Sequence, residues 1–168
     1  MKILLCSDIH GSSYYAGKII EIFEKEKADI LAITGDILYH GARNPLPKEY
    51  DTIKTAEILN SKKDKIIAVK GNCDSEVDSL VLEFPLYESA VIHNGNYKIH
   101  LTHGHTYNKN NMPPIEQGTV LAYGHFHVPL LTEINGITVL NPGSISIPKE
   151  NSKNSYAVID NDIKIYTL

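Results

Sequence analysis

Five short segments of the sequence each end an apolar run with residues that can bind a metal ion. Their aspartate, asparagine and histidine side chains offer oxygen and nitrogen donors. A strand that ends in such a residue places its side chain at the rim of a sheet, so five such rims can converge on one point. The donors suffice for two metal ions that share a carboxylate, a known device for hydrolysing phosphoryl esters. The segments are residues 6–10, 34–36, 70–74, 102–105 and 123–127.

Each segment alone also has an ordinary structural explanation. Asp8 could cap a helix ahead of a surface histidine, while residues 35–36 and 71–74 resemble common turns. The histidine pairs at 103–105 and 125–127 could lie in surface loops. All five segments nevertheless follow apolar runs, and independent turns would not fall at strand ends so regularly. No Cys-x-x-Cys, His-Glu-x-x-His, phosphate-loop or Gly-x-Ser-x-Gly motif offers a competing site.

The length and composition predict one folded unit, a single domain over residues 1–168. A chain of this size buries roughly 70% of its unfolded surface, so it needs no disulfide staple, and two cysteines do not indicate one. The net charge of −4 comes without any basic run, which argues against a large nucleic-acid surface. The first apolar stretch is too short for a signal peptide, and no window approaches a membrane span. We therefore expect a soluble, cytoplasmic protein.

The apolar pattern predicts an α/β protein in which two sheets pack together with helices outside. In the first half, buried strands alternate with amphipathic helices, which favours parallel pairing. Ser12 or Ser13 is expected to cap the first helix. The expected elements are strands at 2–7, 29–34 and 65–70, a helix that runs to about residue 27, and a helix at about 52–61.

The second half of the chain has a different rhythm. Residues 94–95 and 135–136 are Asn-Gly pairs between β-patterned runs, and 161–162 is a third plausible turn. We therefore expect antiparallel strands joined by hairpins. The segments 39–49 and 107–116, rich in proline with glycine or asparagine, are expected to be loops. Both should lie over the rim that carries the donors, where loops commonly select the substrate.

The order of the motifs resembles that of the calcineurin-like metallophosphoesterases. Asp-x-His, Gly-Asp, Gly-Asn-x-Asp, Gly-His and Gly-His-x-His follow one another in this sequence. Within that family the chain is most similar to the small bacterial branch of YfcE-type phosphodiesterases. The resemblance runs from Lys2 to about Asp162, and its supporting stretches are residues 7–11, 71–78, 101–105 and 141–144.

The resemblance implies a four-layer αββα sandwich with a two-metal site at one edge of its sheets. It also implies a metal-dependent phosphodiesterase, in which a hydroxide that bridges the ions attacks the phosphoester. Asp36 corresponds to the carboxylate that the two ions share. The matching ligands are Asp8, His10 and His127 for one ion and Asn72, His103 and His125 for the other.

Other positions of the motifs have expected supporting roles. The resemblance makes Asp74 a residue that orients its neighbours by hydrogen bonds. His105, the second histidine of its motif, is either a ligand or a group that supports the ligands, and it is also a candidate for substrate binding. Cys73 stands where many family members have a histidine that assists the leaving group, although the YfcE-type branch shares this cysteine. A thiol donates a proton poorly, so we expect a preference for diesters or for esters with good leaving groups. Arg43 and Asn44 are candidates for substrate binding, Arg43 as a clamp for phosphate oxygens.

The sequence leaves the metal and the substrate open. Nitrogen and oxygen donors without thiolate fit Mn, Fe, Co, Ni or Zn, and the family favours Mn²⁺. The expected substrate is a small, nucleotide-like phosphoester, and an exposed sheet edge would allow a homodimer.

Two other functions could account for parts of this pattern. The same fold serves as a non-catalytic protein-interaction scaffold in the retromer complex, where ligand positions have drifted; here all seven positions hold competent ligands. A single-metal amide or ester hydrolase would leave Asn72 unexplained, because an asparagine carbonyl is typical of hard cations.

Overall fold

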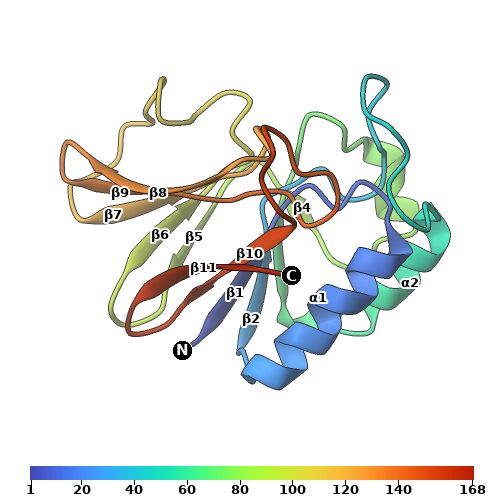
Figure 1. Cartoon of the computed structure of the whole chain (residues 1–168). Helices are drawn as coiled ribbons and strands as arrows, with labels where there is room; N and C mark the ends of the chain where they lie inside the picture. The colour runs from blue at the N-terminus through green and yellow to red at the C-terminus, as the bar shows by residue number, and fades with distance from the viewer.

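Two mixed β-sheets lie face to face in the computed structural model, which describes residues 1–168 (Figure 1). The first sheet has the order β11 (Ile163–Thr167), β10 (Ser155–Ile159), β1 (Ile3–Cys6), β2 (Ile30–Ile33), β3 (Ile66–Val69) and β4 (Leu86–Tyr87). The second has the order β5 (Ala90–His93), β6 (Lys98–Leu101), β7 (Thr119–Ala122), β9 (Ile137–Pro142) and β8 (Pro129–Ile134). The prediction of an α/β protein with two packed sheets is confirmed.

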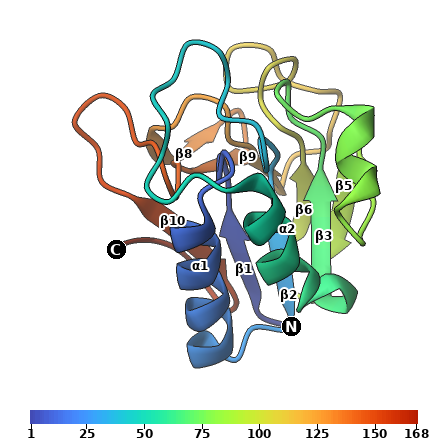
Figure 2. The same ribbon diagram turned by 90° about the vertical axis from the view of Figure 1, so that its right-hand side faces the viewer.

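The first half of the chain forms parallel β-α-β units, as the apolar pattern predicts. β1 pairs with β2, and β2 with β3, all parallel, through α1 (Ser13–Glu26) and α2 (Thr52–Asn60). Ser12 is the N-cap of α1, where its side chain accepts a hydrogen bond from the backbone N–H of Tyr15. Both helices cover the outer face of the first sheet (Figure 2). Two short 3₁₀ helices, η1 (Lys63–Lys65) and η2 (Glu76–Leu80), flank β3.

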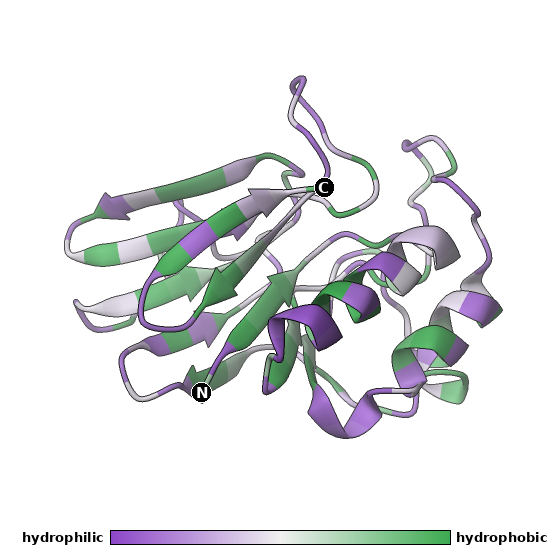
Figure 3. Cartoon of the chain, turned by 60° about the horizontal axis from the view of Figure 1, so that its bottom comes forward, coloured by the Kyte–Doolittle hydropathy of each residue, from purple (hydrophilic) through white to green (hydrophobic).

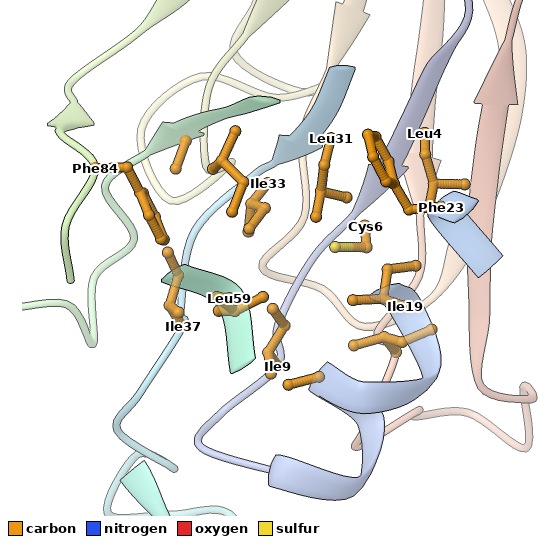
Figure 4. Close-up of a cluster of buried hydrophobic side chains, with 14 of the residues drawn as sticks. Leu4, Cys6, Ile9, Ile19, Phe23, Leu31, Ile33, Ile37, Leu59 and Phe84 are labelled. Carbon is orange, nitrogen blue, oxygen red and sulfur yellow. The ribbon is translucent and has the colours of Figure 1, made fainter. Parts of the chain in front are cut away.

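Alternating residues of the central strands face two separate apolar layers. Leu4 and Cys6 of β1 face the helices, whereas Ile3 and Leu5 face the second sheet, because successive side chains of a strand point to opposite sides. Both faces of β1 are therefore buried, which is why its sequence is continuously apolar. Figure 4 shows the helix-side layer, and Figure 3 shows how apolar colour concentrates on the strands.

The second sheet is only partly antiparallel, which corrects the expectation for this half of the chain. The three predicted turns do join hairpins, β5–β6, β8–β9 and β10–β11. However, β6 pairs with β7 and β7 with β9 in parallel. The long segment 102–118 carries the chain back to the start of the sheet before β7 begins, and such a crossover is what parallel neighbours require.

The outer face of the second sheet is covered by a loop in place of the expected helices. Met112 and Ile115 of this loop pack against the buried side chains of Leu121, Tyr123 and Val139. The sequence suggested that the loops 39–49 and 107–116 both lie over the donor rim. Only the first does, because the second turns outward over the sheet.

Neither of the two α-helices combines the length and the hydrophobicity of a membrane-spanning helix.

Candidate metal centre

The five donor segments follow the carboxyl ends of β1, β2, β3, β6 and β7. These strands are parallel within each sheet, so their carboxyl ends meet along one rim. The two sheets bring the donors of the first three strands against those of the last two. All seven predicted ligand positions lie in this cluster.

Asp8, His10 and His127 form one group of donors. The Oδ1 atom of Asp8 lies 3.3 Å from Nε2 of His127 and 3.8 Å from Nε2 of His10. The two Nε2 atoms are 3.3 Å apart. All three side chains are buried, and Oδ1 of Asp8 has no hydrogen-bond partner in the protein.

Asn72, His103 and His125 form a neighbouring group, with Asp36 between the two. Nε2 of His103 lies 3.0 Å from Oδ1 of Asn72 and 3.4 Å from Oδ2 of Asp36. The same Oδ2 atom lies 3.7 Å from Nε2 of His10 in the first group. The ring of His125 is centred 5.1 Å from that of His103. Asp36 is thus the carboxylate that reaches both groups.

Three of the histidines have their tautomers set by backbone carbonyls. Nδ1 of His10 lies 2.7 Å from the carbonyl oxygen of Tyr39, Nδ1 of His103 lies 2.6 Å from that of Thr34, and Nδ1 of His127 lies 2.6 Å from that of Ile147. A carbonyl oxygen only accepts, so each Nδ1 carries a hydrogen, and in the neutral ring each Nε2 turns its lone pair into the centre. This is the outer-shell arrangement of metal-binding histidines.

The converging lone pairs need a positive charge among them. In the first group two Nε2 lone pairs face each other beside the unpartnered Oδ1 of Asp8. In the second, burial disfavours protonation of His103, but the hydrogen bond to Asp36 and the charges of Asp8 and Asp36 outweigh it and raise the pKa to about 9. Burial also opposes ionisation of Asp36, yet the His103 contact lowers its pKa below the usual range. Divalent cations fit this donor set.

The backbone adopts a left-handed conformation at five of the donor residues, which no sequence motif predicted. Asp8, His10, Asp36, His125 and His127 have φ values of 56°, 52°, 55°, 67° and 59°. Non-glycine residues rarely adopt this left-handed region, and such residues cluster at functional sites. The bends let two side chains from one short segment point to the same place.

The sequence profile of the calcineurin-like phosphoesterase superfamily domain matches residues 1–164. The chain belongs to this superfamily. The family predicted from the order of the motifs is therefore confirmed, and so is the expectation of a metal-dependent phosphoesterase enzyme.

Relatives of this phosphoesterase cover nearly its whole length. It is 43% identical over 166 residues to the phosphodiesterase YfcE of Escherichia coli strain K12. The aligned region covers 97% of this chain and 89% of that protein. A solved structure of the E. coli YfcE phosphoesterase superimposes with a TM-score of 0.96 at 42% identity, over 99% of this chain and 93% of that one.

More distant relatives share less of the sequence. The phosphodiesterase MJ0936 of Methanocaldococcus jannaschii is 30% identical over 152 residues, or 85% of this chain and 83% of that protein. Vps29 of Chaetomium thermophilum has the same fold, with a TM-score of 0.68 at 17% identity over 99% of this chain and 88% of that one.

Asp74 lies beneath the metal centre of the phosphoesterase, and its carboxylate is occupied by hydrogen bonds. Its Oδ2 accepts hydrogen bonds from the backbone N–H groups of Asp36 and Gly71, at 2.8 and 2.7 Å, and its Oδ1 accepts one from Ile37 at 2.7 Å. Burial raises the pKa of this carboxyl to about 6, against the effect of these hydrogen bonds. The side chain fastens the segment after β2 to the segment after β3.

Cys73 lies at the mouth of the centre. Its backbone N–H donates to Oδ1 of Asp36 at 2.9 Å, and the side-chain amide of Asn72 donates to its sulfur at 3.3 Å. Burial and the charge of Asp36 raise the pKa of the thiol to about 12, so it is protonated at neutral pH. In the metal-free protein it is therefore a thiol and not a thiolate.

A cleft of about 610 Å³ opens over the exposed side of the centre. Arg43 and Asn44 line it together with Asn72 and Cys73, so the structure brings these two predicted residues to the metal centre. His105 is not among its lining residues; it lies on the other side of Asn72, with its ring centred 5.4 Å from that of His103.

Several residues of the site carried no signal, or only a weak one, in the sequence. Lys149 and Tyr39 line the cleft, although neither stands in a recognisable motif. Ser144 and Ser146 donate to the carbonyl oxygen of Asp8, at 2.8 and 2.7 Å, and hold its bend. Ser144 belongs to the stretch 141–144 of the family pattern.

Proposed function

We propose that this chain is a phosphodiesterase that hydrolyses small phosphoesters at a two-metal centre. The observation that carries the proposal is the convergence of seven donors around Asp36, with three Nε2 lone pairs and the unpartnered Oδ1 of Asp8 directed into one space. A scaffold that had lost catalysis would have no reason to keep buried groups in so costly an arrangement. The complete donor set therefore favours the enzyme over the scaffold reading.

We assign the donors as the family pattern does. Asp8, His10 and His127 hold one ion, Asp36 bridges, and the remaining donors Asn72, His103 and His125 hold the other. When bound, two divalent ions would activate a water molecule and stabilise the charge that builds on the phosphoryl oxygens. Because Asn72 is exposed and His125 is half-buried, the second group of donors faces the cleft, and the substrate enters from that side.

The residues at the mouth of the centre favour a diester over a monoester. A thiol such as that of Cys73 is a weak hydrogen-bond donor and a poor group to assist a basic leaving group. Beside it, an apolar hollow of about 350 Å³ is lined by Leu38, Tyr39, Tyr50 and Val81. This hollow is contiguous with the cleft through Tyr39 and Cys73, and can hold an organic ester arm such as a nucleoside.

Other chain groups have supporting roles in this proposal. Asp74 is a positioning residue, since its carboxylate binds backbone N–H groups and does not reach substrate. Asn44 steadies the turn that carries Arg43, because its side-chain amide donates to the carbonyl oxygen of His40 at 2.8 Å. Arg43 binds an anionic group of the substrate, and His105 contacts the substrate from the opposite side. Residues 1–168 act as one catalytic domain.

Manganese is the metal that we propose, because carboxylate, amide and imidazole donors without a thiolate suit it. Zinc, nickel, cobalt and iron accept the same donors, so the metal must be established by a panel.

The test is hydrolysis of bis-p-nitrophenyl phosphate, p-nitrophenyl phosphate and the p-nitrophenyl ester of a nucleoside monophosphate, each with a panel of divalent metals. We expect metal-dependent hydrolysis of the two diesters, faster than of the monoester. Asp36→Asn and His125→Ala should lower kcat by at least about a hundredfold, since each removes a ligand. His93→Ala is the control, because His93 is exposed and distant in sequence from the donor segments. No hydrolysis with any metal would favour the scaffold.

A further inference from the structure

The cleft over the metal centre carries two cations that have no partner in the chain. Arg43 is the only arginine in the sequence, against fifteen lysines among sixteen basic residues. It lines the cleft together with Lys149, which comes from the far end of the chain. Neither forms an ion pair with a carboxylate. Both charges are thus available to a ligand.

Each cation is carried on a segment fastened to a donor histidine of the centre. The carbonyl oxygen of Tyr39 accepts from His10, and the turn that follows is closed by a hydrogen bond of 3.1 Å from the Asn44 N–H to the Gly41 carbonyl oxygen. The N–H of Lys149 donates to the carbonyl oxygen of His127 at 3.1 Å. The two charges are therefore carried by segments that also contact the donor histidines His10 and His127.

The negative charges around the centre are distributed unevenly. The acids that line the cleft, Asp36 and Asp74, are buried at its floor and are held by His103 and by backbone N–H groups. The apolar hollow next to Cys73 contains Asp78 and no cation. On the other side of Asn72 the single cation, Lys70, shares the surface with Glu88 and Asp74. An anionic group that extends from the centre is therefore favoured most toward Arg43 and Lys149, where two cations meet no exposed acid in the cleft lining.

We propose that Arg43 and Lys149 form a second anion subsite, which binds a phosphate or carboxylate carried by one ester arm, apart from the scissile phosphate. The proposal rests on the phosphodiesterase function above and specifies its substrate: a diester with one anionic arm. Both side chains are exposed on the rim, whereas the groups that face the scissile phosphate lie at the floor. A guanidinium presents paired N–H donors that match the oxygens of such a group.

The test compares two diesters with the same p-nitrophenyl leaving group. One carries an ethyl arm, and the other carries a 2-phosphonoethyl arm. With wild-type enzyme at low ionic strength, we expect kcat/KM to be about tenfold higher for the phosphonoethyl ester, mainly through KM, because charge-assisted contacts of this kind are worth about that much. Added salt should reduce the preference, because both cations are exposed.

Variants separate this subsite from a contact with the scissile phosphate. Arg43→Gln and Lys149→Gln should each reduce the preference by about threefold or more, and the double variant should abolish it. Lys153→Gln is the matched control, since it removes one exposed charge from the same loop without touching the cleft. Equal losses on both esters would place Arg43 at the scissile phosphate and overturn the proposal, as would equal kcat/KM values in the wild type. If neither ester is hydrolysed with any metal, the proposed function itself fails.

Discussion

The carboxylate of Asp74 accepts a hydrogen bond from the backbone N–H of Asp36 at 2.8 Å, which ties the residue shared by both donor groups to the segment after β3. Asp36 has a left-handed backbone with a φ of 55°, a conformation that needs external support. Asp74 supplies that support through Asp36, Ile37 and Gly71 together. The position of the bridging carboxylate therefore depends on a neighbour whose own carboxylate is occupied by backbone N–H groups.

Asp74→Asn should weaken metal binding without removing a ligand. The amide keeps one acceptor but turns an NH₂ group toward backbone N–H donors, so at least one hydrogen bond is lost. We expect the metal affinity to fall about 10- to 100-fold, as for other outer-shell changes. The free energy of unfolding should drop by about 1–3 kcal/mol. Calorimetric titration and denaturant unfolding measure the two effects.

Asp78→Asn is the matched control for that variant. The carboxylate of Asp78 accepts only from Ser75, in the capping box of η2, so its loss should reduce stability slightly and leave metal affinity unchanged. Equal metal affinity in Asp74→Asn and the wild type would contradict the positioning role.

Cys73→His should broaden the activity toward monoesters. An imidazole with a pKa near its usual value of ~6.5 can give a proton to a leaving alkoxide, whereas the Cys73 thiol has its pKa raised to about 12. We expect kcat for an alkyl monoester such as glycerol 2-phosphate, measured as released phosphate, to rise by about tenfold or more. Cys73→Ser is the control for loss of the thiol without a gain of an imidazole, and alkyl monoester rates that do not differ between Cys73→His and the wild type would sink the idea.

The local part of the site could be predicted from the sequence because apolar runs that end in Asp, Asn or His are local patterns. Once parallel strands are inferred, their ends must share a rim, and the donors of β1, β2 and β3 meet there. The same reasoning failed for the second sheet, because hairpin turns specify only neighbouring strands. The parallel pairing of β6 with β7 depends on the path of segment 102–118, which has no periodic pattern.

The rest of the site depends on contacts between distant segments. The tautomer of His10 is set by Tyr39, 29 residues away, and that of His127 by Ile147, 20 residues away. Carbonyl oxygens have no residue type, so no motif reveals them. Lys149 lines the cleft on a segment that is 22 residues from His127 in sequence and is tied to it by a backbone hydrogen bond from the Lys149 N–H to the His127 carbonyl oxygen. The outer face of the second sheet lacks the predicted helices for a similar reason. A loop packs Met112 and Ile115 against that face, and this contact between distant segments has no periodic pattern in the sequence.

Gly71→Ala should disrupt the centre by steric contact alone. Gly71 does not have a positive φ, but an added Cβ would collide with Oδ1 and the backbone nitrogen of Asp36. We expect the free energy of unfolding to fall by about 1–3 kcal/mol and metal binding to become weaker. Gly17→Ala is the control, since its Cβ would meet nothing within 4 Å in α1 and should stabilise the protein by about 0.5–1 kcal/mol. Unchanged stability and metal affinity in Gly71→Ala would show that the two segments are not tightly apposed.

Removal of the metals should make the stability of the protein fall between pH 6.5 and 8.5. The metal-free protein binds a proton on His103 with a pKa of about 9, because the contacts to Asp36 outweigh the cost of burial. In the unfolded chain this histidine has a pKa of ~6.5. A pKa raised by folding gives stability that is complete below the unfolded value and is lost as the pH approaches the folded one. We expect the free energy of unfolding to decrease by roughly 2 kcal/mol across this window in EDTA.

His103→Gln should flatten this dependence of stability on pH, and the control His93→Ala should not. With Mn²⁺ bound, His103 is a neutral ligand and the decrease should disappear; a flat curve for the metal-free wild type would contradict the assignment of that proton.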